Sequence, residues 1–371
     1  MNILLLSTYV RGSTSTLVKR GFEQAGHRVI AATPAEVSPG NLPDDWLTCD
    51  PRVNVPRLIR ECSWPIDLAV LVESTSSSRF FPSGLLEVPV PTAFWAIDNH
   101  LNYRWHKEYA RQFDVTFFAQ KDYVSAARRY GATNVRWLPL AADAEYHRLE
   151  PRPRRYGVSF IGSVPAGRRK FFDSIDSGIP LNIMSGVYEE QMAAILAESK
   201  IGLNVSIRED LNMRFFEVLA SGALLVTQKI RAGMNDLFEE GTHFVTHNLS
   251  DVSRVLRYYL EHDSLAAEIA RRGRERCLAH HTYRHRCQEL IGLLSDPKAL
   301  ERRRNQTRSY RVDIGEALIF DHPTFRMRAD ARKAYRRAIQ KSRCGTCFYL
   351  LRYFGSYLRE SLRKSFRKTI W

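Results

Sequence analysis

Short apolar runs alternate with amphipathic segments along the first part of this chain. The runs have the length of buried strands, and the segments between them space their apolar residues three and four apart, as helices do. We expect strands at 3–6, 28–32, 68–72, 92–97, 115–119 and 135–138, with helices at 13–25 and 121–130. Strands that alternate with helices through short links predict a doubly wound parallel sheet. Residues 38–56 contain four prolines, so we expect a long loop there.

A linker rich in proline and arginine, at residues 149–155, separates this series from a second one. The second series predicts strands at 156–161, 181–185, 201–205, 223–227 and 244–246, and helices at 168–177, 189–199 and within 250–295. The length of 371 residues also favours two domains over one. We therefore expect an α/β chain of two Rossmann-like domains, at 1–150 and 155–297, followed by an extension at 298–371.

One segment of the second half joins a helix directly to a strand. Asn212 is placed to cap the helix, and Gly222 is placed to end it in the left-handed conformation. Glu209 precedes the helix and Glu217 lies inside it. A helix N-terminus attracts phosphate, while carboxylates bind hydroxyl groups. This combination fits a nucleotide-sugar.

The sequence around this helix resembles the donor half of GT-B glycosyltransferases. The likeness rests on residues 212–222, on 236–241 and on the helical segments 258–283, and it is strongest to the CgeB-like (spore maturation protein) branch of the group 1 glycosyltransferases. It covers about residues 157–295 well and 1–150 more loosely, through 95–100 and 138–143, but not 300–371. The resemblance implies two Rossmann-like domains whose parallel sheets face each other across a cleft, with the acceptor on the first domain and the nucleotide-sugar on the second.

The resemblance also implies roles for the two glutamates. Retaining members of the wider group carry two glutamates separated by seven residues, a spacing that Glu209 and Glu217 share. The second would hold the ribose diol and the first would lie beside the sugar ring, with Asn212 at the start of the donor helix. Residues 210–213 lack the proline and glycine that the wider group has there. A solvated loop acid is therefore the alternative for Glu209.

Cations near the expected helix starts are candidates for the diphosphate. Gly162 and Ser163 end a predicted strand, and Arg168 and Lys170 begin the helix after it, at the sheet edge where such folds bind ligands. By resemblance Arg168 or Lys170 would contact the pyrophosphate, and Arg214 is a further candidate; any one of them can instead be a surface cation. No convincing Asp-x-Asp motif is present, so we expect transfer without a metal or other cofactor.

The first half offers candidates for the acceptor side. Asp98 and His100 follow the apolar run 92–97, where a side chain can orient a hydroxyl or act as a base. The alternative for Asp98 is a cap on the following helix. Gly12 follows the first strand and is expected to line the donor side of the cleft. This turn lacks a GxGxxG pattern, so a nicotinamide cofactor is not expected.

The basic character of the chain belongs to its C-terminal part. The net charge is +15, and residues 300–371 hold 19 Lys/Arg against 6 Asp/Glu. From Cys347 onward the apolar residues recur three and four apart with cations between them, which predicts a basic amphipathic helix. Residues 343–371 can bind an anionic membrane surface or pack back on the first domain. Nucleic acid is a weaker option, because no recognition motif is present.

The remaining features favour a cytoplasmic protein, and the basic tail adds the option of a peripheral position on the cytoplasmic face of the inner membrane. Six scattered cysteines do not form a disulfide framework, and no apolar run is long enough to span a bilayer. We expect a glycosyltransferase acting on a glycan or lipid-linked acceptor. Two alternatives are a nucleotide-sugar 2-epimerase, which shares the fold, and a non-catalytic GT-B-like module that binds membrane or nucleic acid.

Overall fold

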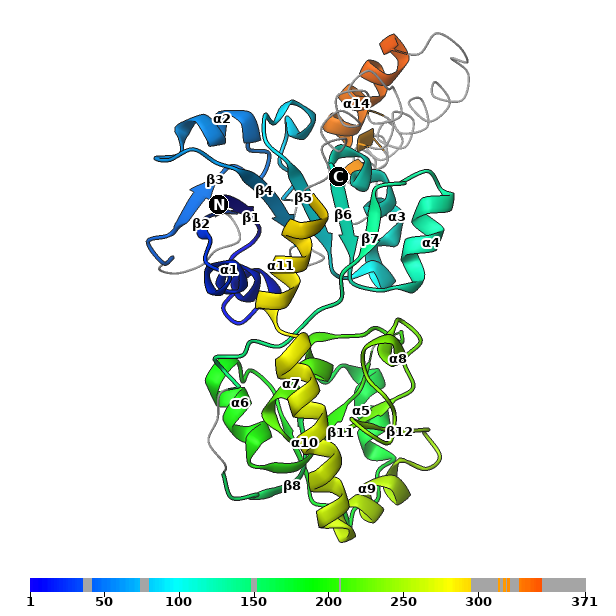
Figure 1. Cartoon of the computed structure of the whole chain (residues 1–371). Helices are drawn as coiled ribbons and strands as arrows, with labels where there is room; N and C mark the ends of the chain where they lie inside the picture. The colour runs from blue at the N-terminus through cyan, green and yellow to red at the C-terminus, as the bar shows by residue number, and fades with distance from the viewer. Residues whose placement is uncertain are drawn as a thin grey trace, which may run out of the picture.

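The computed structural model describes residues 1–35, 42–73, 80–147, 152–206, 208–294, 313, 316–317, 319–320 and 327–341. Within these ranges the chain forms two α/β domains, each built on a parallel sheet (Figure 1). The prediction of two domains with parallel sheets is confirmed.

The N-terminal domain holds a seven-stranded sheet in the order β3-β2-β1-β4-β5-β6-β7, and every neighbouring pair is parallel. Its central strands are buried along their whole length because helices cover both faces. The elements are β1 (Asn2–Leu6), α1 (Thr14–Gln24), β2 (Arg28–Pro34), β3 (Trp46–Cys49), α2 (Val55–Glu61), β4 (Leu68–Val72), β5 (Thr92–Ala96), α3 (Asn99–Tyr109), β6 (Val115–Phe118), α4 (Asp122–Arg129) and β7 (Val135–Trp137).

The expectation of a long loop at 38–56 is wrong, because β3 lies within it and α2 begins at its end. Trp46 is buried and its ring meets that of Tyr9 at 5.0 Å, so burial holds β3 on the edge of the sheet. The side chain of Asn54 accepts a hydrogen bond from the Arg57 N–H and caps α2. Proline is tolerated in this first helical turn, where its missing N–H has no partner to lose.

The C-terminal domain holds a five-stranded parallel sheet in the order β12-β11-β10-β8-β9. As predicted, the Asn212 side chain accepts a hydrogen bond from the Phe215 N–H, and Gly222 ends that helix with φ +75°. The elements are β8 (Tyr156–Ile161), α5 (Ala166–Asp173), β9 (Leu181–Met184), α6 (Glu189–Ala197), β10 (Ser199–Asn204), α7 (Met213–Ser221), β11 (Leu224–Gln228), α8 (Met234–Leu237), β12 (Val245–His247), α9 (Val252–Glu261) and α10 (Asp263–His280).

The chain crosses between the domains twice, and the two crossings are hydrogen-bonded to each other. The Ala142 N–H donates to the His281 carbonyl and the Tyr283 N–H donates to the Ala142 carbonyl. After the second crossing, α11 (Tyr283–Leu294) packs against α1 of the N-terminal domain (Figure 1). A Cβ at Gly21 of α1 would lie 2.8 Å from the Tyr283 carbonyl carbon, so only glycine permits this approach.

Part of the C-terminal extension packs on the N-terminal domain. The helix α14 (Arg328–Lys341) buries Ala331, Ala334 and Tyr335 in one cluster with Phe81 and Trp105. The amphipathic helix predicted from Cys347 onward, like the rest of residues 343–371, lies outside the described residues. Among the helices that the structure describes, none is long and apolar enough to cross a membrane.

Candidate active site

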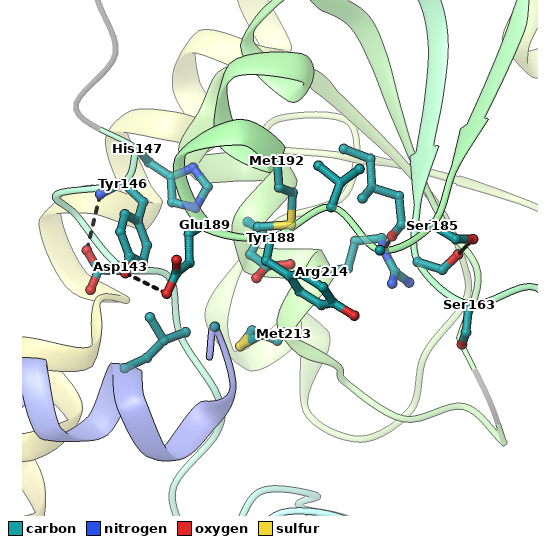
Figure 2. A pocket seen from close by; sticks show the side chains of 17 residues that line it. Asp143, Tyr146, His147, Ser163, Ser185, Tyr188, Glu189, Met192, Met213 and Arg214 are labelled. Atoms are coloured by element: carbon teal, nitrogen blue, oxygen red, sulfur yellow. Dashed lines mark hydrogen bonds between the residues drawn. The ribbon is translucent and has the colours of Figure 1, made fainter. Parts of the chain in front are cut away.

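A cavity of about 360 Å³ lies where the two domains meet, beside the carboxyl ends of strands β8 and β9 (Figure 2). Most of its wall belongs to the C-terminal domain, while the first crossing and the start of α1 close one side. Of the predicted site residues, Gly12, Gly162, Ser163, Arg214 and Glu217 line it. The remaining lining residues are Leu17, Asp143, Tyr146, His147, Ile161, Ser185, Gly186, Val187, Tyr188, Glu189, Met192 and Met213.

Glu217 lies in the second turn of α7 and its side chain is buried at the cavity wall. Burial disfavours the charged carboxylate and raises its pKa to about 7, although the Arg214 guanidinium opposes this shift. Within the described ranges no residue donates a hydrogen bond to this carboxylate, and Arg214 acts on it only through its charge. Glu217 therefore has free acceptor capacity for hydroxyl groups in the cavity.

Arg214 lies in the first turn of α7 and its side chain is partly buried. Its Nε donates to the Ile161 carbonyl, and its Cζ lies 4.5 Å from the centroid of the Phe160 ring. Burial lowers its pKa to about 10, and Glu217 partly offsets that effect. No carboxylate of the described chain approaches it within ion-pair distance. A partly buried cation with no carboxylate at ion-pair distance can bind an anionic ligand.

Gly162 provides the space that Arg214 occupies. Its φ is +149°, and a Cβ built there would lie 2.8 Å from Arg214 Cζ and closer still to Nη2. Both the backbone conformation and the close approach therefore require glycine at the end of β8.

The two other predicted phosphate cations lie outside the cavity wall. Arg168 is buried, and its guanidinium donates to the Ser163 carbonyl at 3.0 Å and to the Val205 carbonyl at 2.7 Å. It thereby ties the ends of β8 and β10 together. Lys170 is exposed on α5. Among the three candidates, the structure brings only Arg214 into the cavity.

Glu209 also lies outside the cavity, on a turn before α7. Its φ is +60°, its side chain is about half exposed and its Oε2 lies 3.7 Å from Arg231 Nε. The next residue turns inward instead: Asp210 is buried and its Oδ1 accepts a hydrogen bond from the Ser206 hydroxyl at 2.6 Å. This inward turn directs the neighbouring Glu209 outward.

Asp98 and His100 lie at the carboxyl end of β5, facing the same turn of the C-terminal domain. The Asp98 side chain makes no capping hydrogen bond, which removes the alternative role considered for it. Burial, together with Glu73 and Asp210, raises the Asp98 pKa to about 7. Arg208 Nη1 donates to the His100 carbonyl at 3.4 Å, so this contact bridges the domains. Neither Asp98 nor His100 lines the cavity.

A buried carboxylate holds this end of β5 in place. Glu73 Oε2 accepts hydrogen bonds from the Ile97 and Asp98 N–H groups, and Oε1 accepts one from the Asn102 side chain. The His106 Nε2 lies 2.9 Å from Oε1. These contacts fix the backbone that presents Asp98 and His100.

Several lining residues have no motif in the sequence that would identify them. In the sequence Glu189 is only an acid at a predicted helix start, and Tyr146 and His147 lie just before the predicted linker at 149–155. Their position depends on how the first crossing passes between the domains. His147 Nδ1 lies 2.8 Å from the Ser221 hydroxyl, and burial lowers its pKa to about 3.

The second domain matches a known family. Residues 155–292 match the family model described as glycosyl transferase-like. A search of curated proteins gave no match.

Solved structures share the two-domain fold at low sequence identity. HepE from Anabaena, solved in complex with UDP, superposes with a TM-score of 0.59 at 11% identity, over 80% of this chain and 100% of that one. The β-glucosyltransferase of T4 phage superposes with a TM-score of 0.51 at 11% identity, over 81% of this chain and 99% of that one. A mutant of TarM from S. aureus, in complex with Fondaparinux, alpha-GlcNAc-glycerol and UDP, superposes with a TM-score of 0.50 at 12% identity. This last match covers 62% of this chain and only 55% of TarM.

These matches establish the fold. The two parallel-sheet domains have the GT-B architecture, and the predicted fold class is confirmed. The CgeB-like branch stays a prediction.

Proposed function

We propose that this protein is a glycosyltransferase that moves a sugar from a nucleotide-sugar to an acceptor. The observation that carries the proposal is the pairing of Arg214 and Glu217 in one cavity at the N-terminal end of α7. A cation without an acidic partner suits a diphosphate, and a carboxylate with free lone pairs suits a diol. The match of residues 155–292 to a glycosyl transferase-like family supports the same assignment.

The diphosphate is the leaving group of such a reaction, and its negative charge grows as the glycosidic bond breaks. In this proposal Arg214 stabilises that charge with its guanidinium, aided by the positive end of the α7 dipole. Gly162 lets the Arg214 guanidinium reach the end of β8, where the phosphates would approach beside Ser163. HepE and TarM were solved with UDP, which makes UDP the first nucleotide to test.

The ribose is the proposed ligand of Glu217. A carboxylate accepts a hydrogen bond from each hydroxyl of a vicinal diol, and it does so best when ionised. The Glu217 pKa of about 7 therefore makes binding sensitive to pH near neutrality. The wall formed by Val187, Tyr188 and Met192 is left for the base.

The finer features of the reaction are part of the proposal. We expect a retaining transfer without a metal, in which Arg214 and the α7 dipole supply the positive charge that a metal ion would otherwise supply. Glu209 is the proposed acid beside the sugar, and it would have to swing from its outward position. Asp98 and His100 would orient the acceptor hydroxyl. A glycan or lipid-linked envelope glycan is the proposed acceptor, reached through an anionic cytoplasmic membrane face that residues 343–371 bind.

Thermal unfolding with a panel of nucleotides tests this assignment. We expect UDP or another nucleoside diphosphate to raise the Tm of the chain, and Glu217→Ala to abolish the shift while folding normally. Conversion of a nucleotide-sugar only when an acceptor is present identifies a transferase. Conversion without any acceptor identifies the 2-epimerase instead. The absence of stabilisation by every nucleotide would contradict both and favour a binding module.

A further inference from the structure

A chain of polar contacts crosses from one domain to the other beside the cavity. Figure 2 shows its central part, between Tyr146 and Glu189. Arg11 of the N-terminal domain donates from Nε to Glu189 Oε2 at 2.6 Å, although Glu189 begins α6 of the C-terminal domain. The Tyr146 hydroxyl donates to Glu189 Oε1 at 3.0 Å. Glu189 is thus held by one group from each side of the cavity mouth.

Tyr146 carries the chain back to the N-terminal domain. Arg20 of α1 donates from Nη2 to the Tyr146 hydroxyl at 2.5 Å, and its guanidinium lies 4.0 Å over the Tyr146 ring. Arg20 Nη1 also lies 3.7 Å from Asp143 Oδ2. Asp143 and Tyr146 directly follow the first crossing, so these contacts fix the crossing as well as the cavity wall.

The backbone at Glu189 is unusual for its residue type. Its φ is +53°, and the other non-glycine residues of the described chain with positive φ are Arg208 and Glu209. Two of them contact the N-terminal domain: Glu189 accepts a hydrogen bond from Arg11, and Arg208 donates one to the His100 carbonyl. Such conformations are unfavourable for non-glycine residues and persist where surrounding contacts hold them. At Glu189 the holding contacts come from Arg11 and Tyr146.

The packing at Gly12 completes this contact between the domains. A Cβ at Gly12 would lie 3.2 Å from the Tyr188 Cβ, so the turn after β1 sits directly on the residue before Glu189. Arg11 itself is largely exposed and does not line the cavity. The Arg11 side chain therefore contacts Glu189 and does not reach into the cavity.

We infer that Glu189 is a positioning residue that latches the two domains together, with Arg11 as its partner. The latch covers the cavity mouth between Gly12 and Tyr188, and Tyr146 links the crossing to Glu189. A ligand that fills the cavity meets Glu189, Tyr146 and Gly12 from the inside, so binding and closure stabilise each other. The identity of that ligand as a nucleotide rests on the proposed function; the latch itself does not.

Small-angle X-ray scattering of the full chain without ligand tests the latch. We expect Arg11→Ala and Glu189→Gln each to increase the radius of gyration, because each removes the ion pair that joins the two domains beside the cavity. The control variants are Arg60→Ala and Glu261→Gln. These residues are exposed, lie in the same domains as the residues they match, and should leave the scattering unchanged. The double variant should open no further than either single one, since both remove the same contact.

Ligand binding provides a second measurement. Arg11 is outside the cavity and its ion pair is exposed, so Arg11→Ala should weaken UDP binding only through the closing equilibrium, by about fivefold at most. If wild-type chain fails to bind any nucleotide, the proposed function is lost while the scattering result still decides the latch. Scattering of Arg11→Ala and Glu189→Gln that matches the wild type overturns the latch, whatever binds in the cavity.

Discussion

Arg214 occupies the space that any side chain at Gly162 would need. A Cβ there would lie 2.8 Å from Arg214 Cζ, and the φ of +149° is itself unfavourable for other residues. The close approach leaves the guanidinium at the cavity wall, where it meets the Ile161 carbonyl and the face of Phe160.

Gly162→Ala should therefore displace the guanidinium and weaken nucleotide binding. We expect the affinity for UDP, measured by calorimetry, to fall at least about tenfold, since a charge-assisted contact to the diphosphate is lost. Gly167→Ala is the matched control, because nothing lies within 4 Å of a Cβ there and the residue is on helix α5. Alanine at that site should bind UDP normally. Equal affinity of the two variants would contradict this account of Gly162.

Arg214→Ala tests the cation directly. We expect UDP affinity to fall about tenfold to a hundredfold, whereas Arg169→Ala on the exposed side of α5 should have no effect. Lysine at 214 should restore only part of the loss, because one ammonium group does not reproduce the planar contacts to Ile161 and Phe160. Binding of uridine, which lacks phosphate, should change less than binding of UDP, because Arg214 reaches the ribose only through the pKa of Glu217.

Glu217 gives a stability signature that depends on pH. Burial raises its pKa from 4.5 to about 7, so the folded chain binds a proton between these values that the unfolded chain has released. Its contribution to stability therefore falls as pH rises through this window. Glu217→Gln should be more stable than the wild type at pH 8, by up to about 3 kcal/mol, and the gain should vanish near pH 4.5. Denaturant unfolding at both pH values measures this.

The same substitution should remove donor binding, so stability and function change in opposite directions. In the wild type, UDP affinity should decrease as pH falls below about 7, because the protonated carboxyl accepts fewer hydrogen bonds. Uridine serves as the ligand control, since it has the ribose diol but no titrating phosphate. Glu261→Gln, at the exposed end of α9, should match the wild type in both measurements.

Transfer should proceed without a divalent metal. Arg214 and the start of α7 supply the positive charge that the bound metal ion supplies in metal-dependent enzymes. We expect turnover in excess EDTA to equal turnover in magnesium or manganese. Loss of turnover in EDTA, with recovery on adding metal, would contradict the proposed role of Arg214.

Glu209 points away from the cavity, and a rate measurement decides its role. Glu209→Gln should leave UDP affinity unchanged, because the side chain lies outside the cavity, but should reduce kcat if the residue swings in to contact the sugar. Glu239→Gln is an exposed control in the same domain. Unchanged kcat would identify Glu209 as a solvated loop acid.

Much of the fold and part of the site follow from local pattern. Strands β4 and β8 match their predicted ranges residue for residue, and the cap at Asn212 and the stop at Gly222 form as expected. These features depend on periodicity and on the hydrogen-bonding of nearby residues, which the sequence contains directly. The loop predicted at 38–56 is wrong because burial of Trp46, a tertiary effect, outweighs its proline content.

Sequence alone determined the two α/β domains and the helix that carries Arg214 and Glu217, because those depend on contacts a few residues apart. Only the tertiary structure decided which cations reach the cavity. Arg168 is taken up by the Ser163 and Val205 carbonyls, and Lys170 faces solvent. The tertiary structure also brings Glu189 to Arg11, although the two residues are distant in sequence. The paired crossings at Ala142 and Thr282 fix how the domains meet.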